Sequence, residues 1–214
     1  ERLPAVQGVG GAPHAAGYAL TAPADAARTA DKTTAALAAY LLKTQSGEGH
    51  WRIRTHRPPL EDSDFAATAL AVRGLAAFGK HAPEQKAALQ KSKAWLEQSE
   101  PVSSEDHAFR LLGLKWSGAE ASAIRAARRE LLDRQQPDGG WEQVPDLGSD
   151  AYATGQALVA LHSGGALPVK HAAYRKGLAY LLQTQHADGS WLVATRSKPI
   201  QVYFESGFPH GKSQ

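Results

Sequence analysis

A cluster of acidic residues, Glu61-Asp62-Ser63-Asp64, stands directly before a long apolar stretch of the sequence. Neighbouring carboxylates favour the neutral form of a carboxyl group because they repel one another when ionised, and a carboxyl group that keeps its proton can act as a catalytic acid. We therefore consider Asp62 and Asp64 as candidate catalytic acids. Glu61 and Phe65, on either side of them, are candidate ligand-binding residues.

The alternative interpretation of the same cluster is a helix cap, because Ser and Asp accept hydrogen bonds from the free N–H groups at the start of a helix. Ser104 and Asp150 stand at the start of two other apolar stretches, so capping residues recur in this sequence. We favour an ionised cap for Asp64, which leaves Asp62 as the better candidate acid. Asp150 and the nearby Tyr152 are also candidate ligand-binding residues.

A second group of aromatic and ionisable residues lies near the end of the chain, within residues 198–212. Glu205 and His210 could act as a base and its orienting partner, or could line a ligand groove together with Tyr203. A surface loop that leads to a further helix is the simpler interpretation of this segment.

The residue types present exclude several other chemistries. The chain has no cysteine, which excludes disulfides, thiolate nucleophiles and cysteine-ligated zinc. Its nine histidines form no short pair with metal-ligand spacing, so we expect no metal and no other cofactor. The net charge is only +3, with acids and bases interspersed, so we expect no nucleic-acid partner.

Length and patterning favour one domain without a membrane span. A chain of 214 residues is long enough to bury a sizeable core. Its longest uncharged run, residues 151–169, is interrupted by Gly and Pro and is too short of apolar residues to cross a bilayer. The chain begins at Glu1 without a leader pattern, so we expect a processed product or an excised domain. The compartment and the oligomeric state stay open.

The elements that position these residues are expected to be helices, because alanine is abundant and β-branched runs are rare. Segments that are apolar nearly all round alternate with amphipathic segments that have one polar face. A helix without a polar face must be surrounded by other helices, whereas an amphipathic one faces water on one side. We expect inner helices at residues 64–78, 107–116 and 151–161, opened by the acidic caps Asp64, Asp106 and Asp150, and outer helices at residues 83–98, 119–135 and 169–184.

This alternation indicates repeated helical hairpins with a period of about 35 to 55 residues, as in solenoid-like arrays. The fold class that we expect is all-α, an α/α toroid in which hairpins form a ring with inner and outer layers, here incomplete. Residues 1–16 are expected to form an irregular leading segment and residues 17–214 the toroid domain. Near their junction we expect a short helix at residues 15–20 and a long helix at residues 24–44.

Three turns between these helices share one design, in which a Gln ends an apolar helix, a Gly-containing turn follows, and a Trp stands six residues after the Gln. Gly supplies the backbone freedom to reverse the chain, and the Gln amide offers both a donor and an acceptor to unpaired groups at helix ends. We expect these residues to be structural and to occupy equivalent places. They are Gln45 with Trp51, Gln135 with Trp141, and Gln185 with Trp191.

The turns resemble the QW motif of the squalene-hopene cyclase and prenyltransferase repeat family, and the resemblance covers the chain from about residue 17 to its end. It implies a ring of paired helices that the turns stabilise, and it is more specific for fold than for activity. In squalene-hopene cyclases the acid belongs to an Asp-x-Asp-Asp motif at the head of an inner helix, which here corresponds to residues 62–65 and ends in Phe65 instead of Asp. Protein prenyltransferases use zinc held by Asp, Cys and His, a ligand set that a chain without cysteine cannot supply.

Two hypotheses of different class follow for the function. The first is a non-catalytic or divergent module of a longer protein, which binds an apolar, isoprenoid-like ligand where the inner helices begin and has other domains as partners. The second is an active terpenoid cyclase, an isomerase, with Asp62 or Asp64 as its acid. We favour the first because Phe65 cannot supply the missing carboxylate. A polysaccharide-acting enzyme with an α/α ring is a third hypothesis, which rests on fold analogy alone.

Overall fold

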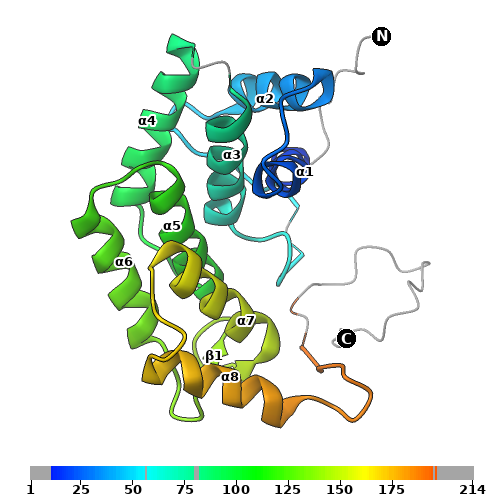
Figure 1. Ribbon diagram of the computed structural model, residues 1–214, viewed down its shortest axis with the longest axis vertical. Coiled ribbons are helices and arrows are strands. Elements are labelled where there is room, and N and C mark those ends of the chain that lie inside the picture. The colour runs from blue at the N-terminus through cyan, green and yellow to red at the C-terminus, as the bar shows by residue number, and fades with distance from the viewer. Residues whose placement is uncertain (1–10, 56, 80–81, 195, 197–214) are drawn as a thin grey trace.

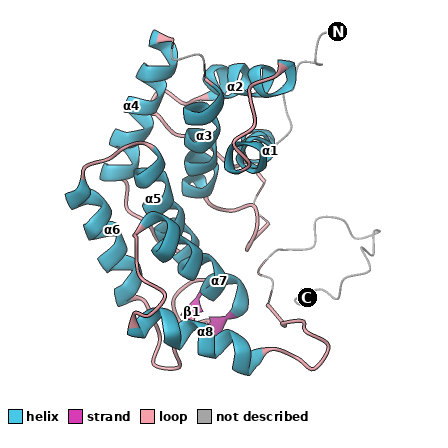
Figure 2. Cartoon of the chain, viewed as in Figure 1, coloured by secondary structure: helices cyan, strands magenta, loops and turns pink. Residues whose placement is uncertain are grey.

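A computed structural model describes residues 11–55, 57–79, 82–194 and 196, and shows an all-α protein (Figure 1, Figure 2). A two-stranded antiparallel ribbon, β1 (Trp141–Glu142) with β2 (Ser149–Asp150), pairs Trp141 with Asp150. The helices are α1 (Ala12–Asp25), α2 (Lys32–Thr44), α3 (Asp64–Phe78), α4 (Pro83–Gln98), α5 (Ser104–Trp116), α6 (Ala121–Asp133), α7 (Ala151–Val159), which continues into the π-helical turn η1 (Ala160–Gly164), and α8 (Ala172–Thr184).

Consecutive helices form the hairpins α1–α2, α3–α4, α5–α6 and α7–α8, which follow one another along an open arc (Figure 1). Helices α1, α3, α5 and α7 contact each other in chain order and form the inner layer. Helices α2, α4, α6 and α8 form the outer layer, and each packs on its own inner partner. The expected all-α class and the expected order of inner and outer helices are therefore confirmed.

Burial separates the two layers as expected. Every residue from Phe65 to Val72 of α3 is buried, so this helix has no face in water. In α4 the buried residues form a single stripe at helical spacing, Gln85, Ala88, Ser92 and Leu96. The outer-layer Arg175 is exposed, whereas the inner-layer Leu111 and Leu158 are buried.

The first hairpin differs from the sequence expectation. Helix α1 begins at Ala12, inside the segment that we expected to be irregular, and the single helix expected at residues 24–44 is divided between α1 and α2. Ala27 between them has a φ of 49°, which an α-helix cannot continue through. Asp31 then caps α2, because its side chain accepts a hydrogen bond from the Thr34 N–H. The high alanine content led us to expect one continuous helix across this break.

The caps of the inner helices are Ser63, Ser103 and Asp150. Ser63 Oγ accepts from the Ala66 N–H at 3.0 Å, so Asp64 is the first helical residue and the expectation that it caps α3 is wrong. Asp106 is likewise not the cap of α5 but completes a capping box with Ser103. In both helices a serine precedes the acid and occupies the extended cap position first.

Candidate functional site

The inner helices α3, α5 and α7 begin on the same side of the arc, where a cluster of polar side chains gathers. Ser63 Oγ donates to Asp106 Oδ1 at 2.6 Å, which joins the start of α3 to the start of α5. Gln143, from the loop after β1, donates to Asp150 Oδ2 at 2.7 Å and so reaches the start of α7. Three inner helices therefore contribute polar groups to one region, as the common cap positions led us to expect.

Asp64 is held by the chain that precedes α3. Its Oδ1 accepts from the Ile53 N–H at 2.7 Å, and its Oδ2 lies 3.8 Å from His50 Nε2. Asp64 thus accepts a backbone hydrogen bond, but the donor is the segment after Trp51 rather than its own helix. The carboxylate serves to fix that segment against α3.

Asp62 lies next to a cation that sequence reasoning did not connect with it. Arg196 Nη1 is 3.9 Å from Asp62 Oδ2, and Arg196 Nε donates to Gln143 Oε1 at 3.0 Å. Arg196 thus links Asp62, before α3, to Gln143 in the loop after β1.

Glu105 is the carboxyl group whose surroundings favour the neutral form. It is the second residue of α5 and only 6% exposed. Burial raises the pKa of Glu105 to about 8, assisted by the nearby charges of Asp106 and Asp62 and opposed by hydrogen bonds from Gln156 and Tyr152. Glu105 was not among the candidate residues predicted from the sequence, because nothing in the sequence at the start of this helix distinguishes a buried acid from an exposed one.

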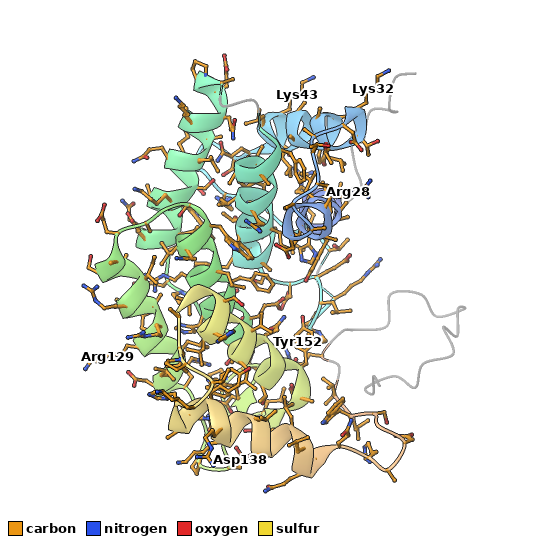
Figure 3. All side chains as sticks on the ribbon, viewed as in Figure 1. Arg28, Lys32, Lys43, Arg129, Asp138 and Tyr152 are labelled. Atoms are coloured by element: carbon orange, nitrogen blue, oxygen red, sulfur yellow. The ribbon has the colours of Figure 1, made fainter. Side chains whose placement is uncertain are left out.

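The hydrogen-bond partners of Glu105 can accommodate either form of its carboxyl group. Tyr152 Oη lies 3.2 Å from the Pro59 carbonyl oxygen and 3.3 Å from Glu105 Oε1, but its single hydrogen can serve only one of them. When Tyr152 donates to Pro59, a neutral Glu105 can donate to Tyr152 in return. Figure 3 shows Tyr152 directed from α7 toward the loop that precedes α3. Burial raises the pKa of Tyr152 as well, so its hydroxyl keeps its proton.

The cavity between these groups is small. Its lining includes Glu105, Tyr152, Gln143 and Arg196, and its volume of about 10 Å³ is roughly what one water molecule needs. Next to it, Gln156 Oε1 is buried without a hydrogen-bond partner. The cavity can hold a water molecule bound to Glu105 and Gln156, but it cannot hold an isoprenoid chain.

The other candidate residues lie in different surroundings. Phe65 is buried in the core, with its ring 4.6 Å from the ring of Trp95, and Glu61 is half-buried with its carboxylate 3.8 Å from Arg57. Burial raises the pKa of Asp150, against the hydrogen bonds that it accepts from Ala153 and Gln143. Tyr203, Glu205 and His210 lie outside the described residues, so their predicted groove stays a prediction.

The three Gln-to-Trp turns make the same internal hydrogen bonds. Each Trp donates its indole N–H to a helix carbonyl ten residues earlier, at Leu41, Leu131 and Leu181, over distances of 2.8–3.0 Å. Each Gln donates its amide to the turn glycine, at Gly49, Gly139 and Gly189. All three glycines have φ between 90° and 102°, where a side chain would be strained. The side chains therefore occupy equivalent places, and the six residues close helix ends.

Residues 11–55, 57–79, 82–194 and 196 contain no group of three His, Asp or Glu side chains arranged to hold a metal ion. Among the same residues, no helix combines the length and the apolar character that crossing a membrane requires.

Comparison with known proteins finds distant relatives. No protein-family model matches the chain. It is 30% identical over 164 residues to a drimenyl diphosphate synthase of Streptomyces showdoensis. The aligned region covers 65% of this chain and 28% of that protein. It is 35% identical over 86 residues to a drimenyl diphosphate synthase of Streptantibioticus cattleyicolor, which covers 40% of this chain and 15% of that protein.

The chain thus spans less than a third of the length of either relative. The similarity supports a terpenoid cyclase-like family, which agrees with the all-α fold. It does not single out the squalene-hopene repeat that the Gln-to-Trp turns resemble.

Proposed function

We propose that this chain is a terpenoid cyclase-like helical module that binds an apolar, isoprenoid-like ligand and leaves it unchanged. The observation that carries the proposal is the surroundings of the carboxyl groups at the head of the inner helices. Asp62 lies beside Arg196, Asp64 accepts a hydrogen bond from Ile53, and Glu105 lies against a cavity the size of one water molecule. An alkene-protonating acid must reach its substrate, and in the described part of the chain none of these three carboxyl groups lines a cavity that can hold an isoprenoid chain.

Apolar side chains near the starts of the inner helices supply the binding surface. Leu60 is 60% exposed and follows Pro59, whose carbonyl oxygen accepts from Tyr152. Tyr18 of α1 is exposed and close enough to Glu105 for the two to interact electrostatically. An exposed leucine and an exposed tyrosine beside a small polar cavity fit a ligand with an apolar body and one polar end.

Binding can be tested with farnesol, a short isoprenoid alcohol, by native mass spectrometry and titration. We expect a one-to-one complex whose affinity falls at least about tenfold in Leu60→Glu, which corresponds to about 1.4 kcal/mol of binding free energy. Val169→Glu is the matched control, because Val169 is 56% exposed and precedes α8, on the far side of η1 from the head of α7. Equal affinity in the two variants would contradict binding at Leu60, and no complex with the unaltered chain would contradict the proposal itself.

A second function is favoured by the burial of Glu105, which raises the pKa of Glu105 to about 8. An active cyclase would use Glu105 as its acid in place of Asp62, after a movement of the Tyr152 and Pro59 region that opens the cavity to substrate. This hypothesis predicts turnover that is lost in Glu105→Gln and kept in Asp64→Asn, because Gln reproduces the shape of the neutral acid without its transferable proton.

A further inference from the structure

Two of the three Gln-to-Trp turns bind the next outer helix, and we call the surface that each turn offers to that helix its seat. Gln45 Nε2, at the end of α2, donates to the Ala88 carbonyl oxygen of α4 at 2.9 Å. Gln135 Nε2, after α6, donates to the Ala173 carbonyl oxygen of α8 at 2.8 Å. In both turns the outer helix lies so close to the glycine that an added Cβ would meet the carbonyl group of a lysine, Lys91 at Gly49 and Lys176 at Gly139.

The same two turns also bind the next inner helix. The Trp51 N–H donates to Thr68 Oγ1 of α3 at 3.1 Å, and the Trp141 N–H donates to Thr154 Oγ1 of α7 at 2.9 Å. Both threonines are completely buried. Each occupied turn therefore joins itself to both helices of one hairpin, through a Gln amide to the outer helix and a Trp amide to a threonine on the inner helix.

The third turn has the same internal geometry, but no hairpin of the described residues occupies it. Among the residues that the structure describes, Gln185 Nε2 donates only to Gly189, and the Trp191 N–H has no hydroxyl partner. Gln185 and Gly189 are exposed and Trp191 is half-buried, whereas Gly139 and Trp141 are buried. Exposed leucines surround this turn, Leu178, Leu182 and Leu192.

We propose that the turn formed by residues 185–191 is the docking site for one further helical hairpin of the α7–α8 kind. The occupied turns define its chemistry. Its outer helix offers a free backbone carbonyl to Gln185 and carries a small residue four positions later, as Ser92 follows Ala88 and Gly177 follows Ala173. Its inner helix presents a threonine to the Trp191 N–H.

The small residue is required by the close packing of the outer helix. A Cβ on Gly177 would lie 2.9 Å from Leu158 Cδ2 and 2.9 Å from Trp141 Cζ3, so a larger side chain does not fit there. Ser92 is completely buried and donates to the Gly49 carbonyl oxygen at 2.9 Å. A hairpin with a bulky residue at this position is therefore excluded from the seat.

This requirement distinguishes a further hairpin from a second copy of the chain. The α3–α4 and α7–α8 hairpins already lie in seats of their own molecule, and α5–α6 is packed between them. This leaves α1–α2 as the hairpin at the free edge of the arc (Figure 1). The small residue lies four positions before a leucine in both helices, Ser92 before Leu96 in α4 and Gly177 before Leu181 in α8. In α2 the corresponding leucine is Leu41, and the residue four positions before it is Leu37. Helix α2 therefore lacks the small residue, and head-to-tail assembly of copies through this turn is disfavoured.

A fusion protein tests the proposal on the full chain. A second copy of residues 149–194 is appended after Gln214 through a long Gly/Ser linker. Amide hydrogen exchange is measured at Trp191 of the original chain, not at the same position of the appended copy. We expect exchange at Trp191 to slow at least about tenfold relative to the unfused chain. The matched control carries Thr154→Val and Gly177→Leu in the appended copy only, and we expect it to leave the exchange rate at Trp191 unchanged.

Two results would overturn the proposal. Exchange at Trp191 that is equally fast in the unfused chain and in the fusion would show that the turn does not seat such a hairpin. Concentration-dependent protection of Trp191 in the unfused chain, with a dimer in sedimentation velocity, would assign the surface to a second copy instead. Neither readout depends on ligand binding, so both are independent of the function proposed above.

Discussion

Replacing Trp141 by Ala removes the centre of a Gln-to-Trp turn whose Trp is completely buried. The Trp141 side chain is 0% exposed and belongs to the core cluster formed with α5, α6 and α7. Large aromatic truncations in protein cores cost about 3 to 5 kcal/mol. The loss of the 2.8 Å bond from the indole N–H also leaves the Leu131 carbonyl oxygen without this donor, which adds about 1 kcal/mol or more.

We therefore expect Trp141→Ala to lower the free energy of unfolding by about 4 to 6 kcal/mol. The assay is urea unfolding followed by circular dichroism, in which a lower midpoint at an unchanged slope reports a change in stability. Because a loss of this size can unfold a domain outright, Trp141→Phe serves as the milder variant. It keeps most of the buried area, removes the indole N–H, and should cost about 1 to 3 kcal/mol.

Trp191→Ala is the matched control, since Trp191 makes the same indole bond but is only half-buried. Its cost should be less than half that of Trp141→Ala because less apolar area returns to water. Equal losses in the two variants, or a loss below about 1 kcal/mol for Trp141→Ala, would refute the view that burial by a following hairpin makes these turns stabilising.

Two further predictions concern the head of the inner helices. The pKa of Glu105 lies at about 8 in the folded chain and near 4.5 when unfolded, so the native state binds more protons between these values. The stability that Glu105 contributes should therefore be fully present below about pH 4.5 and be lost as pH rises toward 8, and urea unfolding at several pH values should show this loss in the unaltered chain relative to Glu105→Gln. Ser63→Ala should lower the free energy of unfolding by about 1 to 2 kcal/mol, because it removes the cap of α3 and the hydrogen bond to Asp106. Asp64→Asn should lower it by at most about 1 kcal/mol, because an amide oxygen can still accept from the Ile53 N–H. A larger loss for Asp64→Asn than for Ser63→Ala in thermal unfolding would restore Asp64 as the cap.

Periodicity made most of the helices predictable. The expected bounds of α3 and α4 agree with the structure at both ends, since Ser63 and Pro83 are strong start signals and the apolar and polar faces are unambiguous. The break between α1 and α2 was missed because alanine suits a helix at every position and residues 25–34 contain neither Gly nor Pro to mark a break.

The candidate site was less predictable than the fold. A carboxyl group's role depends on what surrounds it, and the partners of Asp62 and Glu105 come from distant parts of the sequence. Arg196 lies more than a hundred residues after Asp62, and Tyr152 is 47 residues after Glu105. Sequence reasoning placed acids at the helix heads correctly, but it could not tell which one would be buried away from water and which one would lie beside a guanidinium.

The most direct test of the proposed function is product analysis by gas chromatography after incubation of the purified chain with squalene or a shorter isoprenoid. We expect the isoprenoid to be recovered unchanged, with part of it bound to the protein. A cyclised product that disappears in Asp62→Asn or in Glu105→Gln, while circular dichroism shows the fold intact, would contradict the account and identify the chain as a catalyst.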